Sequence, residues 1–132
     1  MTRRELRENI FKMLFRVEFH EEGEMPEQLG LLDEELDNIK EEDAAYMNQK
    51  CRDIISKISE IDEAINASTT GWKTTRMGKV DLSIIRLAVY EIKFEEDVPA
   101  KVAINEAVEL AKAYGTDNSA SFVNGVLAKF VC

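Results

Sequence analysis

The sequence predicts an all-α protein, and three observations support this. Apolar residues recur at spacings of three and four along most of the chain, which is the period of an amphipathic helix. The 132 residues, of which 45% are hydrophobic, suffice for one compact domain with its own core. The run Ser-Thr-Thr-Gly at residues 68–71 is the one convincing internal linker, and it divides the chain roughly in half.

The first helix should begin just after Thr2, because the T-x-x-E spacing of Thr2 and Glu5 predicts a capping box. Two apolar stripes follow at helical spacing: Leu6, Ile10, Met13, Leu14 and Val17 in one, and Phe11, Phe15 and Phe19 in the other. So wide an apolar arc predicts a helix that packs on more than one side.

Two more helices are expected before the linker. Pro26 should open an acidic helix that ends near Lys40. The next helix should be long and regular, because its apolar residues alternate spacings of four and three: Met47, Cys51, Ile54, Ile58, Ile61 and Ile65. This repeat is short and the chain continues into further helices, which favours a bundle over a coiled coil.

A central buried helix is predicted after the linker, because apolar residues surround the segment 80–92 on nearly every side. Arg86 lies inside this segment, and a buried guanidinium must be paired. We therefore expect a structural ion pair for Arg86 rather than a contact with a ligand. The candidate carboxylates are Asp81, Glu91 and Glu106.

The segment 98–130 predicts two short helices joined by a polar hinge. The first should begin around Pro99 and end at Tyr114, where Gly115 would supply a left-handed cap. Three hinge residues could accept the amide hydrogens of the next helix: Asp117, Asn118 and Ser119. That helix should bury its apolar positions: Phe122, Val123, Val126, Leu127 and Phe130. Tyr114 and Phe122 are expected near one corner.

The net charge of −9 is distributed unevenly. Residues 1–16 carry five basic and two acidic side chains, residues 17–67 carry four basic and sixteen acidic ones, and residues 68–132 carry eight of each. A chain built this way could contact RNA with its basic first helix and offer an acidic surface to a basic partner.

No catalytic residue, metal site or cofactor is predicted. The chain has no glycine-rich phosphate loop, no zinc spacing and no nucleophile with an evident base. His20 is interpreted as a surface residue, Cys51 as core and Cys132 as a loose terminal thiol. The start lacks an apolar leader and no stretch approaches the roughly 20 apolar residues that span a bilayer, so a cytoplasmic protein is expected.

The segments INEAVELAKAYG and FVNGVL closely resemble the C-terminal signature of the NusB transcription antitermination family. WKTTRMGKVDLSIIRLAVYEIKFEEDVP is similar to the central segment of that family, and TRRELRENIFKMLF is similar to its arginine-rich opening helix. The resemblance implies one helical domain, residues 1–132, of two packed three-helix sub-bundles at roughly 1–67 and 72–132. It also implies an adaptor and not an enzyme.

The resemblance implies site residues by position. Arg3, Arg4 and Arg7 match the arginine-rich motif that contacts RNA in the family. Tyr114 and Phe122 match its aromatic positions, where single-stranded bases stack, and Asn118 is the favoured hinge residue. Phe122 could equally be a core residue. Two positions are associated with the family's protein interface: Phe15 and Asp81.

The implied partners are the boxA element of nascent ribosomal-operon RNA and the ribosomal protein NusE, with other Nus factors and RNA polymerase contacted indirectly. Glu5 interrupts the arginine cluster, so RNA affinity without NusE should be low. Two alternatives stay open. One is a protein-binding helical scaffold, perhaps a homodimer, and the other is an RNA-binding module for a separate RNA methyltransferase.

Overall fold

The computed structural model describes residues 1–17, 39–69 and 71–131. All regular structure in these ranges is helical, which confirms the predicted fold class. The elements are α1 (Arg3–Val17), α3 (Glu41–Ser56), α4 (Ile58–Ser68), the short 3₁₀ helix η2 (Thr74–Arg76), α5 (Lys79–Phe94), α6 (Ala100–Tyr114) and α7 (Ser119–Ala128). They form two compact units, residues 1–56 and 57–132.

Several sequence predictions fall outside the described residues. These are the acidic helix that starts at Pro26, except for its end near Lys40, and the predictions for Phe19, His20 and Cys132.

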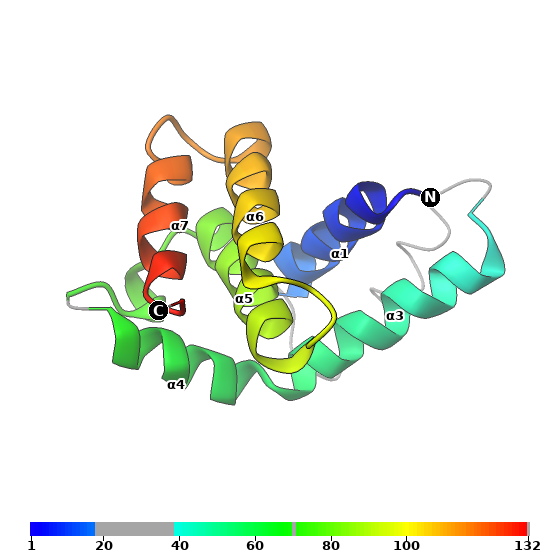
Figure 1. Ribbon diagram of the computed structural model, residues 1–132, viewed down its shortest axis with the longest axis horizontal. Coiled ribbons are helices and arrows are strands. Elements are labelled where there is room, and N and C mark those ends of the chain that lie inside the picture. Colours follow the sequence, from blue (N-terminus) through cyan, green and yellow to red (C-terminus); the bar gives the residue numbers. More distant parts are fainter. Residues whose placement is uncertain (18–38, 70, 132) are drawn as a thin grey trace. The chain divides into compact units, whose positions relative to one another are not determined.

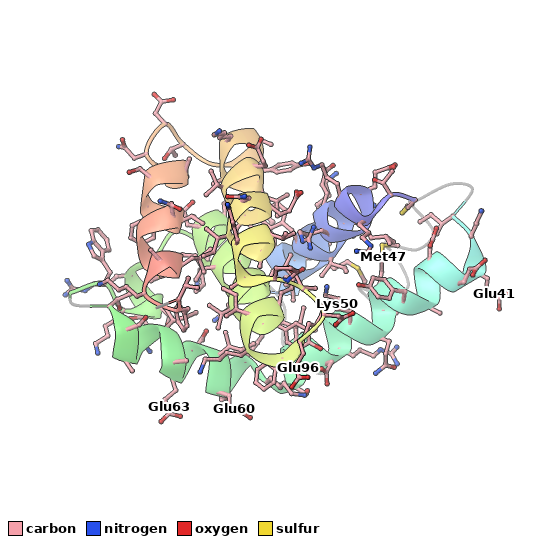
Figure 2. All side chains as sticks on the ribbon, viewed as in Figure 1. Glu41, Met47, Lys50, Glu60, Glu63 and Glu96 are labelled. Atoms are coloured by element: carbon pink, nitrogen blue, oxygen red, sulfur yellow. The ribbon has the colours of Figure 1, made fainter. Side chains whose placement is uncertain are left out.

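In the first unit, α1 and α3 pack side by side (Figure 1). Ile10 and Met13 of α1 and Met47 and Ile54 of α3 are almost completely buried, as their spacing predicted. Figure 2 shows Met47 and Lys50 on the side of α3 that faces α1, whereas Glu41 projects from the start of α3. The first unit therefore has an apolar seam between two amphipathic helices.

The start of α1 confirms the predicted capping box. The Glu5 amide donates to Thr2 Oγ1 and the Thr2 amide donates to Glu5 Oε1, both at 3.1 Å. The backbone amide of Thr2 and the Thr2 side chain lower the pKa of Glu5, because they hydrogen-bond its charged form. Two amides that the helix cannot satisfy itself are thereby paired.

The predicted long helix through Met47 and Ile65 is wrong, because it is interrupted at Lys57. Helix α3 ends at Ser56 and α4 begins at Ile58, with Lys57 between them at φ −109° and ψ 8°. Ser56 Oγ donates to the carbonyl oxygen of Asp53 at 2.6 Å, a local bond of the kind that competes with the helix backbone. The boundary between the two units lies at this break and not at residues 68–71, so α4 belongs to the second unit.

In the second unit, α5 is the central helix, and every residue from 82 to 91 is buried. Helices α6 and α7 pack against each other and against α5, while α4 crosses below them in the view of Figure 1. Helix α7 has only ten residues, two of them serine and one glycine, and it buries three apolar side chains: Val123, Val126 and Leu127. Phe130, predicted in this helix, lies just beyond its end and is half-buried.

Arg86 is buried in α5 and paired, as predicted, and it binds a carboxylate that the sequence predictions did not name, that of Asp62 in α4. Arg86 Nε donates to Asp62 Oδ1 at 2.8 Å and Arg86 Nη2 donates to Asp62 Oδ2 at 2.7 Å. The predicted partners Asp81, Glu91 and Glu106 are not the residues in this two-bond pair. The fork geometry matches guanidinium to carboxylate and fixes α4 on α5.

Burial disfavours both charges of the pair. It raises the pKa of Asp62 to about 6 and lowers the pKa of Arg86 to about 10, so both groups remain ionised at neutral pH. The two short hydrogen bonds offset this loss of hydration.

We expect Asp62→Asn to lower the free energy of unfolding by about 3 kcal/mol at pH 7, because it removes the carboxylate charge that meets the Arg86 guanidinium in the two-bond pair. Chemical denaturation followed by circular dichroism measures this loss. The matched control is Glu63→Gln, the same charge change one residue along α4. Glu63 is exposed and points away from the other helices of the second unit (Figure 2), so it should change stability by less than about 0.5 kcal/mol. Equal effects of the two substitutions would contradict this account of the pair.

Candidate nucleic-acid interface

The first group of predicted RNA contacts lies at the start of α1. Arg3 and Arg4 are exposed, and Arg7 is half-buried. Glu5 interrupts this cluster in sequence, but its carboxylate is turned back to the Thr2 amide in the capping box. The acid that weakens the basic cluster is therefore held in a structural role at the helix end.

The second group lies at the hinge between α6 and α7, and α6 begins and ends where the sequence predicted. Pro99 directly precedes α6, and Tyr114 is its last residue. The predicted left-handed cap at Gly115 is wrong, since Gly115 has φ −94° and ψ −168°. A glycine is needed for another reason. A Cβ on Gly115 would overlap the side chain of Ser119 and lie 2.8 Å from the carbonyl oxygen of Ala111.

The hydroxyl of Ser119 closes the hinge. It accepts a hydrogen bond from the Thr116 amide at 2.9 Å and lies 3.2 Å from the Thr116 hydroxyl. Ser119 is buried and bonds backward to Thr116. Asn118, the residue before α7, makes no side-chain cap bond, and its backbone carbonyl accepts from the Phe122 amide at 3.0 Å. The predicted side-chain cap is therefore absent at Asn118, whose exposed amide group is not used to start α7.

The aromatic residues of the hinge are partly accessible. Tyr114 is 37% exposed. Phe122 is half-buried, and its ring centroid lies 5.5 Å from that of Trp72 in an edge-to-face arrangement at 70°. Phe122 therefore packs on a neighbour while part of its ring stays open to solvent.

Trp72 is an exposed aromatic residue that the sequence predictions did not place beside Phe122. Its side chain is 53% exposed, and it lies between α4 and η2. Its position directly after Gly71 in the linker was the available signal, since a large aromatic residue is unusual in a polar turn. Its contact with Phe122 joins two segments that are far apart in sequence.

The predicted site residues fall into two groups. Tyr114, Asn118 and Phe122 share the hinge of the second unit, while the three arginines share α1 of the first unit. The proposed partner contacts are divided in the same way. Phe15 is half-buried on α1 with its ring centroid 6.4 Å from that of Phe11, and Asp81 is half-buried in the first turn of α5.

The described residues contain no group of three histidine, cysteine or carboxylate side chains placed to hold a metal ion. Cys51 is fully buried, as predicted, and this burial raises the pKa of its thiol to about 12, so the thiol stays protonated and unreactive. Within the same ranges, no helix has both the length and the apolar character needed to span a bilayer.

Comparison with known proteins shows the family. The model of the NusB family matches residues 4–131. The chain belongs to the NusB family. It is 63% identical over 130 residues to the transcription antitermination protein NusB of Agathobacter rectalis, covering 98% of this chain and 99% of the relative. It is 55% identical over 131 residues to NusB of Lachnoclostridium phytofermentans, covering 99% of each.

Solved NusB structures share the fold. Thermotoga maritima NusB has a TM-score of 0.85 at 36% identity, with 98% of this chain and 90% of that chain covered. A crystal structure of the antitermination factors NusB and NusE with double-stranded RNA contains a chain with a TM-score of 0.84 at 26% identity, with 97% and 94% covered. This NusB-family chain is a transcription antitermination factor and not an enzyme.

We expect Gly115→Ala to destabilise the protein by about 1 to 3 kcal/mol, because the added methyl group meets Ser119 and a backbone carbonyl that cannot move away. Thermal unfolding followed by circular dichroism tests this. Gly125→Ala is the control. Gly125 lies inside α7 with open space around it, so alanine there should stabilise the helix by about 0.5 to 1 kcal/mol. Two substitutions of the same kind with the same sign of effect would refute the steric role of Gly115.

Proposed function

We propose that this chain binds single-stranded boxA RNA of nascent transcripts, notably those of ribosomal RNA operons, together with the ribosomal protein NusE. The observation that carries the proposal is the likeness of this chain, over almost its whole length, to a NusB solved with NusE and double-stranded RNA. In this proposal the complex of this chain with NusE acts in the cytoplasm. It affects RNA polymerase indirectly, together with other Nus factors.

The proposed RNA contacts form a basic group on α1 of the first unit and an aromatic group at the hinge of the second unit. Arg3, Arg4 and Arg7 would contact phosphates and bases. Tyr114 and Phe122 would stack on bases, and the exposed amide of Asn118 would bond a base edge. Support comes from the exposure of the hinge, where the Asn118 side chain makes no bond that caps α7.

The charge distribution supports a two-protein binding surface. Phosphate binding depends on lysine and arginine, and this chain has a net charge of −9 with one local excess of basic residues at its start. A basic ribosomal protein would add the positive charge that the chain lacks. We assign its contacts to Phe15, a half-buried ring, and Asp81, a half-buried carboxylate.

We expect the chain to bind labelled boxA RNA at least about tenfold more tightly with NusE than without it, because NusE supplies further phosphate contacts. Gel-shift titrations with this protein, with NusE and with both measure the difference, and a scrambled RNA of equal length is the control. Equal affinity with and without NusE would contradict the shared surface. A homodimer that forms in sizing experiments and competes with RNA would favour the protein-binding scaffold instead.

We expect Phe122→Ala to weaken RNA binding in the presence of NusE by about fivefold or more while the protein stays folded. Stacking of one base on an aromatic ring contributes about 1 to 3 kcal/mol, and a half-buried ring leaves the rest of the core in place. Fluorescence anisotropy with labelled RNA measures affinity, and circular dichroism checks the fold. The control is Phe130→Ala, which removes a half-buried ring that follows α7 and has no proposed RNA contact. Unchanged RNA affinity in Phe122→Ala would assign Phe122 to packing alone.

A further inference from the structure

Trp72 exposes about half of the largest aromatic side chain in the protein, at 53%. Water contact with so much aromatic surface is unfavourable, and part of the ring is already engaged with Phe122 at 5.5 Å. Because the two rings meet edge to face at 70°, the indole remains half exposed next to Phe122.

The backbone on both sides of Trp72 is fixed by hydrogen bonds. The Thr69 hydroxyl donates to the Trp72 carbonyl at 2.5 Å, and the Thr74 amide donates to Asn66 Oδ1 at 2.8 Å. Gly71 has φ +87°, a conformation that side-chain-bearing residues rarely adopt, and it turns the chain just before the ring. These bonds hold the backbone of Trp72 near the end of α4.

Two basic residues follow Trp72 closely in the sequence. Lys73 and Arg76 are both exposed, and neither makes an ion pair with a residue in the described ranges. They lie one and four residues after Trp72, in and next to η2. An exposed aromatic ring followed within four residues by two exposed cations has the chemistry that the two parts of a nucleotide need, because a base stacks on a ring and a phosphate pairs with lysine or arginine.

We propose that Trp72 forms with Phe122 an additional stacking position for a base of single-stranded RNA, with Lys73 and Arg76 binding the neighbouring phosphates. This inference rests on the proposed function, that the chain binds RNA. The chemistry favours RNA over an acidic peptide, because carboxylates would pair with the two cations but would leave the indole without a flat partner.

The chain has a single tryptophan, so a label on tryptophan reports this position alone. Protein that contains 5-fluorotryptophan gives one ¹⁹F resonance, and unlabelled NusE adds none. We expect NusE alone to leave that resonance in place. Single-stranded boxA RNA added to the complex with NusE should shift it, along a titration curve that fits the dissociation constant from anisotropy. A resonance that stays in place while RNA binds overturns the inference and leaves the proposed function standing.

Substitutions test the same position without a label. Trp72→Leu keeps apolar bulk but removes the aromatic face, so RNA affinity in the presence of NusE should fall at least about fivefold, while Trp72→Phe should retain most of it. The matched control is Tyr46→Leu, because Tyr46 is a 47% exposed aromatic residue on α3 of the first unit. Circular dichroism melting checks that each variant is folded. Equal RNA affinity of Trp72→Leu and the unsubstituted protein overturns the inference.

Two further outcomes separate this inference from its alternatives. Poly-glutamate that shifts the ¹⁹F resonance at lower concentration than RNA would make the position a site for an acidic peptide and overturn the RNA assignment. Failure of the unsubstituted protein to bind RNA, with and without NusE, would overturn the proposed function and this inference with it. A loss confined to Trp72→Leu supports the inference.

Discussion

The ion pair between Arg86 and Asp62 is the constraint on which the second unit depends. In a central helix that is buried on every side, hydrophobic burial alone does not determine which face of the helix packs against which neighbouring helix. One guanidinium in that helix accepts only a partner that meets it with fork geometry. The pair thereby selects one placement of α4 against α5. Trp72 and η2 follow α4 in the chain, so their position depends on that placement.

Helix positions followed from the sequence more directly than helix partners did. The periodicity located α1, α5 and α6 well, since burial of one face or of all faces leaves a regular signal. The same periodicity hid the break at Lys57, because its spacing of four and three continues across the break without change. Asp62 was missed because it precedes Arg86 by 24 residues on another helix, whereas the predicted partners were chosen from nearer in the sequence or the same helix.

The sequence predicted only part of the geometry of the candidate site, because that geometry also depends on contacts between residues far apart in the chain. Gly115 was predicted to supply a left-handed cap and instead provides room that a Cβ would fill, because a sequence does not distinguish the need for a positive φ from the need to lack a Cβ. Asn118 and Ser119 were both plausible caps, and only the position of the Ser119 hydroxyl shows that it bonds backward. Trp72 could not be placed beside Phe122, because their contact joins a linker to a helix about fifty residues later.

The composition of α7 makes the folding of this helix depend on the rest of the second unit. Ten residues that include two serines and a glycine would not hold a helix in water, because the intrinsic preference is weak and the segment is shorter than a stable isolated helix. Its order comes from burial of Val123 and Leu127 against the rest of the second unit. The hinge surface therefore forms cooperatively with that core, so a ligand bound there would hold the whole unit in its folded state.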